Sequence, residues 1–362
     1  MKKLLALLLA LSAVLPLGGC GGKSASSSPA TTAAATAQQP QEVLDGLVKR
    51  HRFEGTVIAV RGGKRVAESA TGVADPQTGT KTDIDSLFCV GSLSKQFVAA
   101  SVLLLQERGM LSVDDTLGKY FPECPYGGRV TLRQMLQMQS GIAEFYETVP
   151  DGHNVNELPV GTLRETVTNS GTKEGNRDLL QQWLFEQPLT FTPGSTIAYT
   201  NSNYFLLARL VEQLSEMPYE DFLRQNIFAP LGMTHTGFVD DMLDDPHLAK
   251  NAKEAQTVYV GITMGLGDLV TNAADMERWL CSFFGDGLLT AESIAMMTEA
   301  QGYGFGVVPA GSGSWYHTGI FTSYSSFDYV DPKTRSCMFA VTNNQSTMPY
   351  GVSEVCYEFL SN

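Results

Sequence analysis

Strand-like sequence lies at both ends of the folded part of this chain. Residues 55–72 contain two β-rich runs around a Gly-Gly turn, which is a hairpin signal. Residues 303–319 form a strand–turn–strand pattern, and residues 326–344 form a second one with its turn at Asp-Pro-Lys. Hairpins so far apart in the chain must pair with each other or leave exposed edges. We therefore expect one antiparallel sheet built from both chain ends.

Helix-like sequence fills the middle of the chain. Apolar residues recur at helical spacing in residues 92–108, 131–138 and 203–216, and residues 352–360 form a closing amphipathic helix. This pattern predicts an α/β fold of the α+β type, in which helices flank the sheet and a helical lobe at about 110–255 is inserted between the strands. A ligand site is then expected in the cleft between sheet and lobe.

The first twenty residues have the composition of an export signal. Lys2 and Lys3 provide a positive start, and apolar residues run from Leu4 to Leu17, which is too short to span a bilayer comfortably. The run ends in LGGC at Cys20, which resembles a bacterial lipobox. That resemblance implies cleavage before Cys20 and a lipid on its sulfur. The alternative is an ordinary cleaved signal peptide with an incidental cysteine.

These features divide the chain into a signal peptide (1–19), a lipidated cysteine with a flexible linker (20–41) and a folded domain (42–362). The linker is rich in Gly, Ser, Ala, Thr, Gln and Pro. About 20 such residues reach roughly 25 Å, so the folded part would work close to a membrane surface. We expect the protein to be lipid-anchored at the extracytoplasmic face of the cell membrane.

Composition argues against several other classes of function. With 25 basic and 38 acidic residues the chain carries a net charge of -13, which disfavours binding to nucleic acid or to anionic lipid through charge. No C-x-x-C pattern occurs and the five histidines are scattered, so neither a metal centre nor a cofactor is expected.

Beyond Cys20 an odd number of cysteines remains, so a monomer keeps at least one free thiol. Cys281 and Cys337 lie in apolar runs typical of core residues.

The pattern S-x-x-K occurs twice. Ser and Lys at this spacing share one face of a helix, where the lysine can accept the serine proton if its environment favours the neutral amine. Ser170 and Lys173 lie in a polar stretch containing Gly, which favours a solvated loop. Ser92 and Lys95 follow the apolar run LFCV and open an apolar helix. They are the candidate nucleophile and base.

Two further patterns could carry chemistry. Tyr-x-Asn occurs once, at Tyr199 and Asn201, just before a helix. A phenol near a lysine can act as general acid or base. A buried Tyr and a helix-capping Asn without a catalytic role would give the same sequence pattern. A cationic residue followed by Thr-Gly occurs at His235, in a loop, and at His317, at the end of a strand pattern. A glycine at a strand end lets a substrate approach the backbone closely, whereas a lone His there is more often structural.

In this order and spacing, the three patterns resemble the serine β-lactamase-like family, in particular its branch of class C β-lactamases, D,D-carboxypeptidases and serine esterases. The resemblance covers roughly residues 55–360 and is carried by residues 87–145, 190–238 and 264–344, whereas 146–180 match poorly. It implies a β-lactamase/transpeptidase-like fold for the domain at 42–362.

The resemblance also implies roles for the residues that carry the reaction. Ser92 would be the acylated nucleophile, and Lys95 would deprotonate it. Tyr199 would pass the proton to the leaving group and activate water for deacylation. Asn201 would hold the amide of the acyl side chain.

On the substrate side, the resemblance points to His317, Thr318, Gly319 and Ile320. His317 stands where many relatives have lysine, and the HTG form resembles D,D-peptidases and esterases more than enzymes that destroy penicillin. The oxyanion hole would consist of the backbone N–H groups of Ser92 and Ile320. Ile320 replaces a frequent small residue, so its branched side chain should narrow the pocket or redirect the substrate.

The resemblance therefore predicts an exported, membrane-anchored serine hydrolase that acts through an acyl-enzyme. The HTG form and the run YTNSNY at 199–204 favour D,D-carboxypeptidase-like action on cell-wall peptides. An ester, a small D-amino-acid peptide or a β-lactam remain open as substrates, as does a penicillin-binding sensor without turnover. The expected partners are a small-molecule or peptidoglycan-peptide substrate and, through the lipid, the membrane; nucleic acid is not expected.

Overall fold

The computed structural model describes the chain from residue 39, with short gaps. The described residues are 39–150, 155–167, 171–250, 260–285, 287–299, 302–321, 323–344 and 350–360. Cys20 and the predicted signal peptide lie outside them. Helix α1 (Pro40–His51) begins two residues before the expected start of the folded domain. Among the described residues, no helix combines the length and apolarity needed to cross a bilayer.

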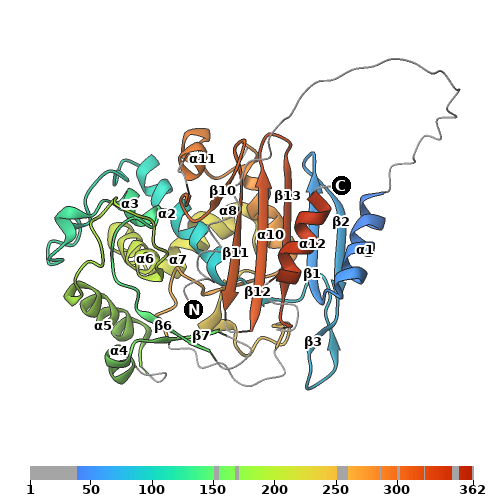
Figure 1. The fold of residues 1–362 in the computed structure, drawn as a ribbon, viewed down its shortest axis with the longest axis horizontal. Coiled ribbons are helices and arrows are strands. Elements are labelled where there is room, and N and C mark those ends of the chain that lie inside the picture. Colours follow the sequence, from blue (N-terminus) through green and yellow to red (C-terminus); the bar gives the residue numbers. More distant parts are fainter. Residues whose placement is uncertain are drawn as a thin grey trace, which may run out of the picture. The chain divides into compact units, whose positions relative to one another are not determined.

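A six-stranded antiparallel sheet unites the two ends of the chain (Figure 1). Its order is β10-β11-β12-β13-β1-β2. The strands are β1 (Gly55–Arg61), β2 (Lys64–Thr71), β10 (Val308–Gly311), β11 (Ser314–Phe321), β12 (Tyr324–Asp331) and β13 (Ser336–Thr342). In the centre of the sheet, β1 pairs with β13, and Val60 lies opposite Cys337. The expectation of one antiparallel sheet built from both ends is confirmed.

The two faces of the sheet contribute to different hydrophobic cores. On one face, Val57, Ala59 and Met338 pack with α1 and with the closing helix α12 (Tyr350–Leu360). On the other face, Ile58 and Val60 join the main core, which includes helix α10 (Ala273–Cys281). Both faces are covered, which explains why β1 and β13 are nearly continuous apolar runs. The sheet is thus the middle layer between two sets of helices.

The helical lobe lies beside the sheet and is centred on α2 (Ser94–Glu107) and α6 (Asn201–Ser215) (Figure 1). Around them lie α3 (Leu132–Leu136), α4 (Gly161–Thr166), α5 (Lys173–Glu186) and α7 (Tyr219–Leu223). The region that matched the family poorly contains a hairpin of β6 (Tyr146–Pro150) and β7 (Val155–Pro159), followed by α4 and the start of α5.

Short elements complete the fold. They are β3 (Val73–Asp75), β4 (Thr80–Lys81), β5 (Phe88–Cys89), α8 (Ala229–Leu231), β8 (Gly237–Phe238), α9 (Val239–Met242), β9 (Leu269–Thr271) and α11 (Ala291–Thr298). Single helical turns occur at Gly91–Leu93 (η1), Leu117–Lys119 (η2), Gly127–Arg129 (η3), Arg224–Phe228 (η4) and Ser282–Phe284 (η5).

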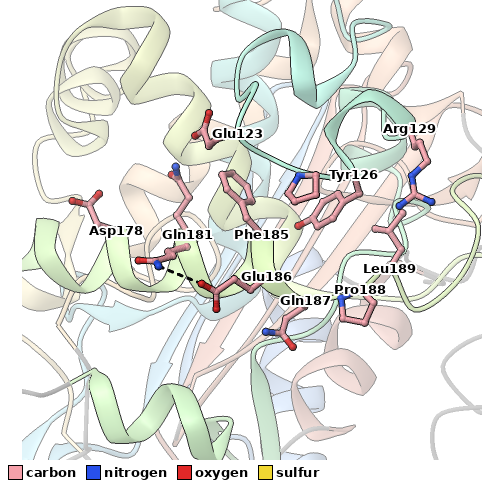
Figure 2. A pocket seen from close by; sticks show the side chains of 12 residues that line it. Glu123, Tyr126, Arg129, Asp178, Gln181, Phe185, Glu186, Gln187, Pro188 and Leu189 are labelled. Atoms are coloured by element: carbon pink, nitrogen blue, oxygen red, sulfur yellow. Dashed lines mark hydrogen bonds between the residues drawn. The ribbon is translucent and has the colours of Figure 1, made fainter.

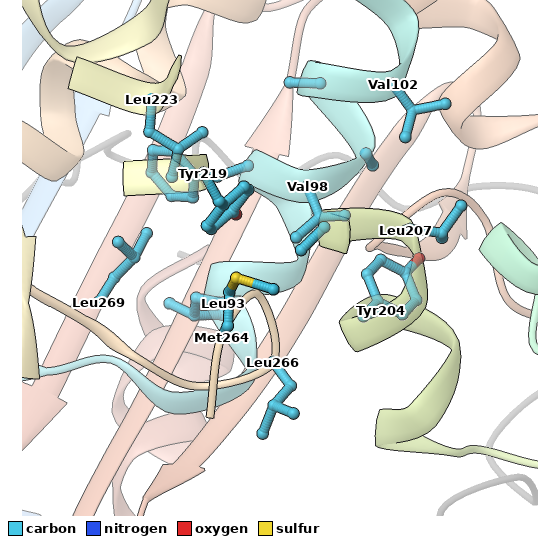
Figure 3. Close-up of a cluster of buried hydrophobic side chains, with 14 of the residues drawn as sticks. Leu93, Val98, Val102, Tyr204, Leu207, Tyr219, Leu223, Met264, Leu266 and Leu269 are labelled. Atoms are coloured by element: carbon cyan, nitrogen blue, oxygen red, sulfur yellow. The ribbon is translucent and has the colours of Figure 1, made fainter. Parts of the chain in front are cut away.

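Helix α2 runs through the middle of the molecule. All of its residues from Ser94 to Leu105 are buried, so the helix has no solvent face in this part. Figure 3 shows Val98 and Val102 of α2 beside Tyr204 and Leu207 of α6. A helix that is apolar all round must be enclosed by other elements. Here those elements are the sheet and α6, so the lysine that α2 carries is held by fixed surroundings.

A chain of buried polar side chains links α10, α2 and the sheet. Trp279 Nε1 donates to Gln96 Oε1 (2.9 Å), and Gln96 Nε2 donates to Asp328 Oδ2 (2.7 Å). The other oxygen of Asp328 accepts the backbone N–H of His317 (2.9 Å). Because Asp328 is fully buried, loss of hydration raises the pKa of its carboxyl to about 7.

This raised pKa predicts a pH dependence of stability. Between about pH 4 and pH 7, the folded state keeps the Asp328 proton and the unfolded state loses it. The free energy of unfolding therefore falls as the pH rises, by at most about 1.4 kcal/mol per pH unit from this group. We expect Asp328→Asn to flatten this slope when urea unfolding is followed at pH 4 to 7. The same slope in both proteins would contradict the assignment.

Candidate active site

Ser92 is held where the polypeptide passes from β5 into α2. Gly91 adopts a positive φ of 56°. Ser92 lies in the turn η1, two residues before α2 begins. A Cβ atom on Gly91 would lie 2.8 Å from the backbone nitrogen of Ile320. The left-handed conformation and the close approach both require glycine. They bring the backbone next to Ser92 against the strand that contributes Ile320.

Lys95 lies one helical turn after Ser92 and is fully buried. Its Nζ atom donates to Ser92 Oγ (3.1 Å), to Asn201 Oδ1 (2.9 Å) and to the backbone oxygen of Leu266 (2.8 Å). These three oxygen atoms satisfy the buried amine with hydrogen bonds. The amine is therefore fixed in direct contact with the serine oxygen, which is the geometry that proton transfer between them needs.

Tyr199 and Asn201 enter the site from the start of α6. The helix is capped by Thr200, whose side chain accepts from Ser202 N. Residues on either side of this cap point to different partners: Tyr199 OH bonds Ser92 Oγ (2.8 Å), and Asn201 Oδ1 accepts from Lys95. Tyr199 remains 46% exposed, so its hydroxyl lies between the serine and solvent. The motif thus brings a proton donor and an amide to the same serine–lysine pair.

The edge of β11 forms the opposite wall. Gly319 is buried, while Thr318 and Ile320 are exposed. A Cβ on Gly319 would lie 2.0 Å from the oxygen of Val90, an oxygen that also accepts from Ser326 Oγ (2.7 Å). Gly319 is therefore needed for contact between the strand and the segment before Ser92. Ile320 is 49% exposed, so its apolar side chain is available to a substrate.

His317 differs from the cation expected at this position. Its side chain is 4% exposed; its Nδ1 bonds the backbone oxygen of Thr318 (2.6 Å) and its Nε2 bonds Tyr303 OH (2.9 Å). Burial, together with the nearby charge of Lys95, lowers the pKa of His317 to about 3. The imidazole is thus neutral, Nδ1 donates to the carbonyl, and Tyr303 donates to Nε2. The structure provides a neutral side chain where the sequence pattern indicated a positive one.

The structure adds three groups that the motifs do not reveal. Tyr303 covers His317 and packs edge-on against Tyr199, with ring centroids 5.9 Å apart. The oxygen of Leu266 accepts from Lys95, and Gly265 N donates to Asp268 Oδ1 (3.1 Å) within the same turn. A backbone oxygen leaves no sequence signal. Tyr303 could have been suspected only from its place in the strand pattern at 303–319.

Glu144 is the third group. Its Oε2 accepts the backbone N–H of Asn201 (2.6 Å), and its Oε1 accepts from Phe145 N (2.8 Å) and Tyr146 N (3.0 Å). A carboxylate at a helix N-terminus satisfies unpaired N–H groups and interacts favourably with the helix dipole. Glu144 thus fixes the first turn of α6, the turn that presents Tyr199 and Asn201.

The motifs that were interpreted as loops lie elsewhere. Lys173 starts α5 and bonds Asp241 Oδ1 (2.8 Å), whereas Ser170 lies outside the described residues. His235 is exposed, and its backbone N–H donates to Asp275 Oδ2 (2.7 Å). Within the part of the chain that the structure describes, no three or more metal-binding side chains converge.

A groove of about 870 Å³ lies along α5 (Figure 2). Tyr126, Phe185 and Leu189 contribute to its lining, together with acidic and amide side chains such as Glu123 and Gln181. Neither Ser92, Lys95 nor Tyr199 lines it. The groove is therefore separate from the serine–lysine site, and none of the candidate catalytic residues lines it.

The role of Glu144 leads to a prediction. In Glu144→Gln, an amide N–H₂ replaces one acceptor oxygen and faces either the N–H of Asn201 or those of Phe145 and Tyr146, so at least one of these hydrogen bonds is lost, which costs about 1–3 kcal/mol and loosens the contact between Glu144 and the start of α6. We expect kcat/KM to fall about tenfold or more in an assay with a chromogenic ester. Glu165→Gln, which changes an exposed glutamate, serves as the control. A lower melting temperature with unchanged kcat/KM would show that Glu144 only caps the helix.

Comparison with known proteins agrees with this geometry. Residues 40–355 match the protein family described as Beta-lactamase. PbpX, a Bacillus subtilis (strain 168) protein named as a penicillin-binding protein, is 26% identical over 331 residues, covering 88% of this chain and 78% of the relative. The family resemblance expected from the three motifs is therefore confirmed.

Solved structures share the fold. D-amino acid amidase from Ochrobactrum anthropi SV3 superposes with a TM-score of 0.70 at 22% identity, covering 89% of this chain and 97% of the amidase. A class C beta lactamase from Rhodobacter sphaeroides gives a TM-score of 0.68 at 20% identity, covering 88% and 97%. The β-lactamase/transpeptidase-like fold expected from the sequence is thus confirmed, and the chain belongs to the beta-lactamase family of serine hydrolases.

Proposed function

We propose that Ser92 is the nucleophile of an acyl-transfer reaction that ends in hydrolysis. The observation that carries this proposal is the position of Ser92 Oγ, which lies 3.1 Å from Lys95 Nζ and 2.8 Å from Tyr199 OH. A nucleophile with two proton-transfer groups in contact is the arrangement that covalent catalysis requires. Partial exposure of Ser92 and Tyr199 leaves the oxygen accessible to a substrate.

In the acylation step Lys95 acts as the neutral amine: Ser92 Oγ attacks the carbonyl carbon of the substrate, and the serine proton passes to the Lys95 amine, which becomes an ammonium group. The developing negative charge on the carbonyl oxygen lies between the backbone N–H groups of Ser92 and Ile320, which the Gly91 contact brings together. Tyr199 delivers a proton to the leaving group. In deacylation, the Tyr199 phenolate takes a proton from a water molecule that attacks the acyl-enzyme, and the Lys95 ammonium returns its proton to Ser92.

For the substrate, we propose peptides of the bacterial cell wall that end in D-alanyl-D-alanine, cleaved in the manner of a D,D-carboxypeptidase. The HTG motif, the run YTNSNY and the similarity to a protein named as a penicillin-binding protein support this proposal. The similarity in fold to a D-amino acid amidase is compatible with an acyl group of D configuration. In this proposal, Asn201, whose Oδ1 accepts from Lys95, would hold the amide of that acyl group.

Ester hydrolysis is a second candidate, favoured by the state of His317. A C-terminal carboxylate is recognised most strongly by a positive charge, but this imidazole is neutral and covered by Tyr303. The exposed part of β11 instead offers the Thr318 hydroxyl and the Ile320 side chain. These groups suit an uncharged, partly apolar leaving group, such as that of a carboxylic ester.

The first experiment tests whether Ser92 is the residue that a substrate acylates. We expect Ser92→Ala to abolish turnover and the mass increase that follows incubation with a penicillin, because the attacking oxygen is lost. Ser170→Ala, which changes the other S-x-x-K motif, is the matched control and should retain both. Activity and the adduct are measured by chromogenic assay and intact-protein mass spectrometry. Undiminished turnover by Ser92→Ala would eliminate this mechanism.

The same preparation distinguishes the two substrate classes. A D-alanyl-D-alanine peptide with a free carboxylate is compared with an ester of the same acyl group. A higher kcat/KM for the peptide supports the carboxypeptidase proposal, and a higher value for the ester supports the second candidate. Penicillin acylation of Ser92 without continuing turnover of either substrate would identify a sensor instead.

We also propose that the protein is anchored to the outer side of the cell membrane by a lipid on Cys20. The proposal rests on the lipobox-like sequence LGGC and on the Gly-, Ser- and Ala-rich residues that follow it. We expect the full chain to sediment with membranes when cells are fractionated and Cys20→Ser to lose the lipid mass. Equal distribution of the two proteins between membrane and soluble fractions would refute the anchor.

A further inference from the structure

Two cysteines from distant parts of the chain meet between the sheet and the helix layer behind it. Cys281 is the last residue of α10, and Cys337 lies in β13, the strand beside β1. Their sulfur atoms are 4.0 Å apart. The five described cysteines are all thiols in the structure, and Cys89, Cys124 and Cys356 are buried. Cys281 is partly exposed, so one sulfur of the pair can be reached from outside.

The surroundings of the pair hold both residues in place. Cys337 is 2% exposed and is paired on both sides of its strand, opposite Val60 and opposite Val330. Cys281 follows Trp279, which is locked into the core by its bond to Gln96. The sulfurs need to approach by about 2 Å to reach the length of a disulfide bond, 2.03–2.05 Å. Rotation of the two side chains shares that movement between them.

The electrostatic environment assigns different roles to the two sulfurs. The hydrogen bond between the two sulfurs, in which either can be the donor, is the main cause that lowers the pKa of the Cys281 thiol; Arg335 and Arg65 add to this effect, whereas burial and Glu277 oppose it. The bond and burial raise the pKa of Cys337. A partly exposed thiolate near cations is the form that attacks a disulfide. Cys281 is therefore the sulfur that reacts first, and Cys337 is the one that completes the bond.

We infer that Cys281 and Cys337 are a dithiol site that a small disulfide oxidises to a bond joining α10 to β13. With oxidised glutathione, the Cys281 thiolate attacks one sulfur, forms a mixed disulfide and releases a glutathione thiolate. Cys337 then attacks the Cys281 sulfur and releases the second glutathione, which takes the Cys337 proton. The protein loses two hydrogen atoms and two electrons, and one glutathione disulfide is reduced to two thiols. The inference does not depend on the proposed function.

The expected consequence is a disulfide cross-link between two elements that pack against the main core. The bond closes a loop that contains α11 and the strands β10, β11 and β12, so it restricts the unfolded chain over a long segment. The oxidised protein should therefore melt at a higher temperature than the reduced protein. The two elements that the bond joins, α10 and β13, carry none of the candidate site residues, so hydrolysis should continue in both forms.

Peptide mapping provides the test. The purified protein is incubated with oxidised glutathione, remaining thiols are alkylated, and tryptic peptides are analysed without reduction. We expect a cross-link between the peptide that contains Cys281 and peptide 336–362, with an intact mass lower by two hydrogen atoms. Because Cys337 and Cys356 share that peptide, the cross-link is also measured in Cys356→Ser, where it should persist. Reduction should abolish it and lower the melting temperature.

Cys281→Ser is the matched negative variant, because it changes a partly exposed residue at a helix end and leaves the sheet intact. It should form no cross-link, and its melting temperature should not respond to glutathione. The inference is overturned if the wild type accumulates only the mixed disulfide on Cys281. It is also overturned if the cross-link is lost in Cys356→Ser or if it persists in Cys281→Ser.

Discussion

A lysine amine buried in a protein core needs oxygen atoms around it, and the position of Lys95 determines much of this structure. Its amine donates to Ser92 in the preceding turn η1, to Asn201 and to the backbone oxygen of Leu266; the last two lie 106 and 171 residues away from Lys95 in the chain. An uncompensated buried charge is so unfavourable that these segments must converge. The requirement to satisfy one amine therefore brings together Ser92, which we propose as the nucleophile, helix α6 and the loop before β9.

Close contact between two backbone segments fixes the position of the substrate-facing side of the site. Gly91 and Gly319 allow β11 to approach the segment around Ser92 more closely than any side chain would permit. The resulting site combines rigid main-chain atoms on the substrate side with side chains fixed by helices on the other. Catalytic groups held by packed elements keep their geometry better than groups on isolated loops. The exposed Tyr199 and Ile320 are then the parts that a substrate meets.

The sequence predicted those parts of the site that lie close together in the chain. Ser92 lies in η1 and Lys95 in the first turn of α2, which follows directly, and Tyr199 and Asn201 flank one helix cap. Local spacing therefore singled out both pairs, and the family resemblance then implied their chemistry. The hairpins at both ends likewise indicated the sheet, because strand and turn patterns are local. Three groups act through contacts between distant segments, and no local motif predicts them: Glu144, Tyr303 and the backbone oxygen of Leu266. The charge of His317 could not be predicted either, because it depends on burial beneath Tyr303.

The pairing of β1 between β2 and β13 also means that the sheet cannot be completed until the carboxyl-terminal part of the chain has been made. Ser92 and Lys95 leave the ribosome early, but the wall of the site at β11 and the central partner β13 are among the last segments made. A chain that ends before residue 336 contains Ser92, Lys95 and strand β11 but lacks β13. Since β13 is the strand that joins β12 to β1, the six-stranded sheet then remains divided into β10–β12 and β1–β2.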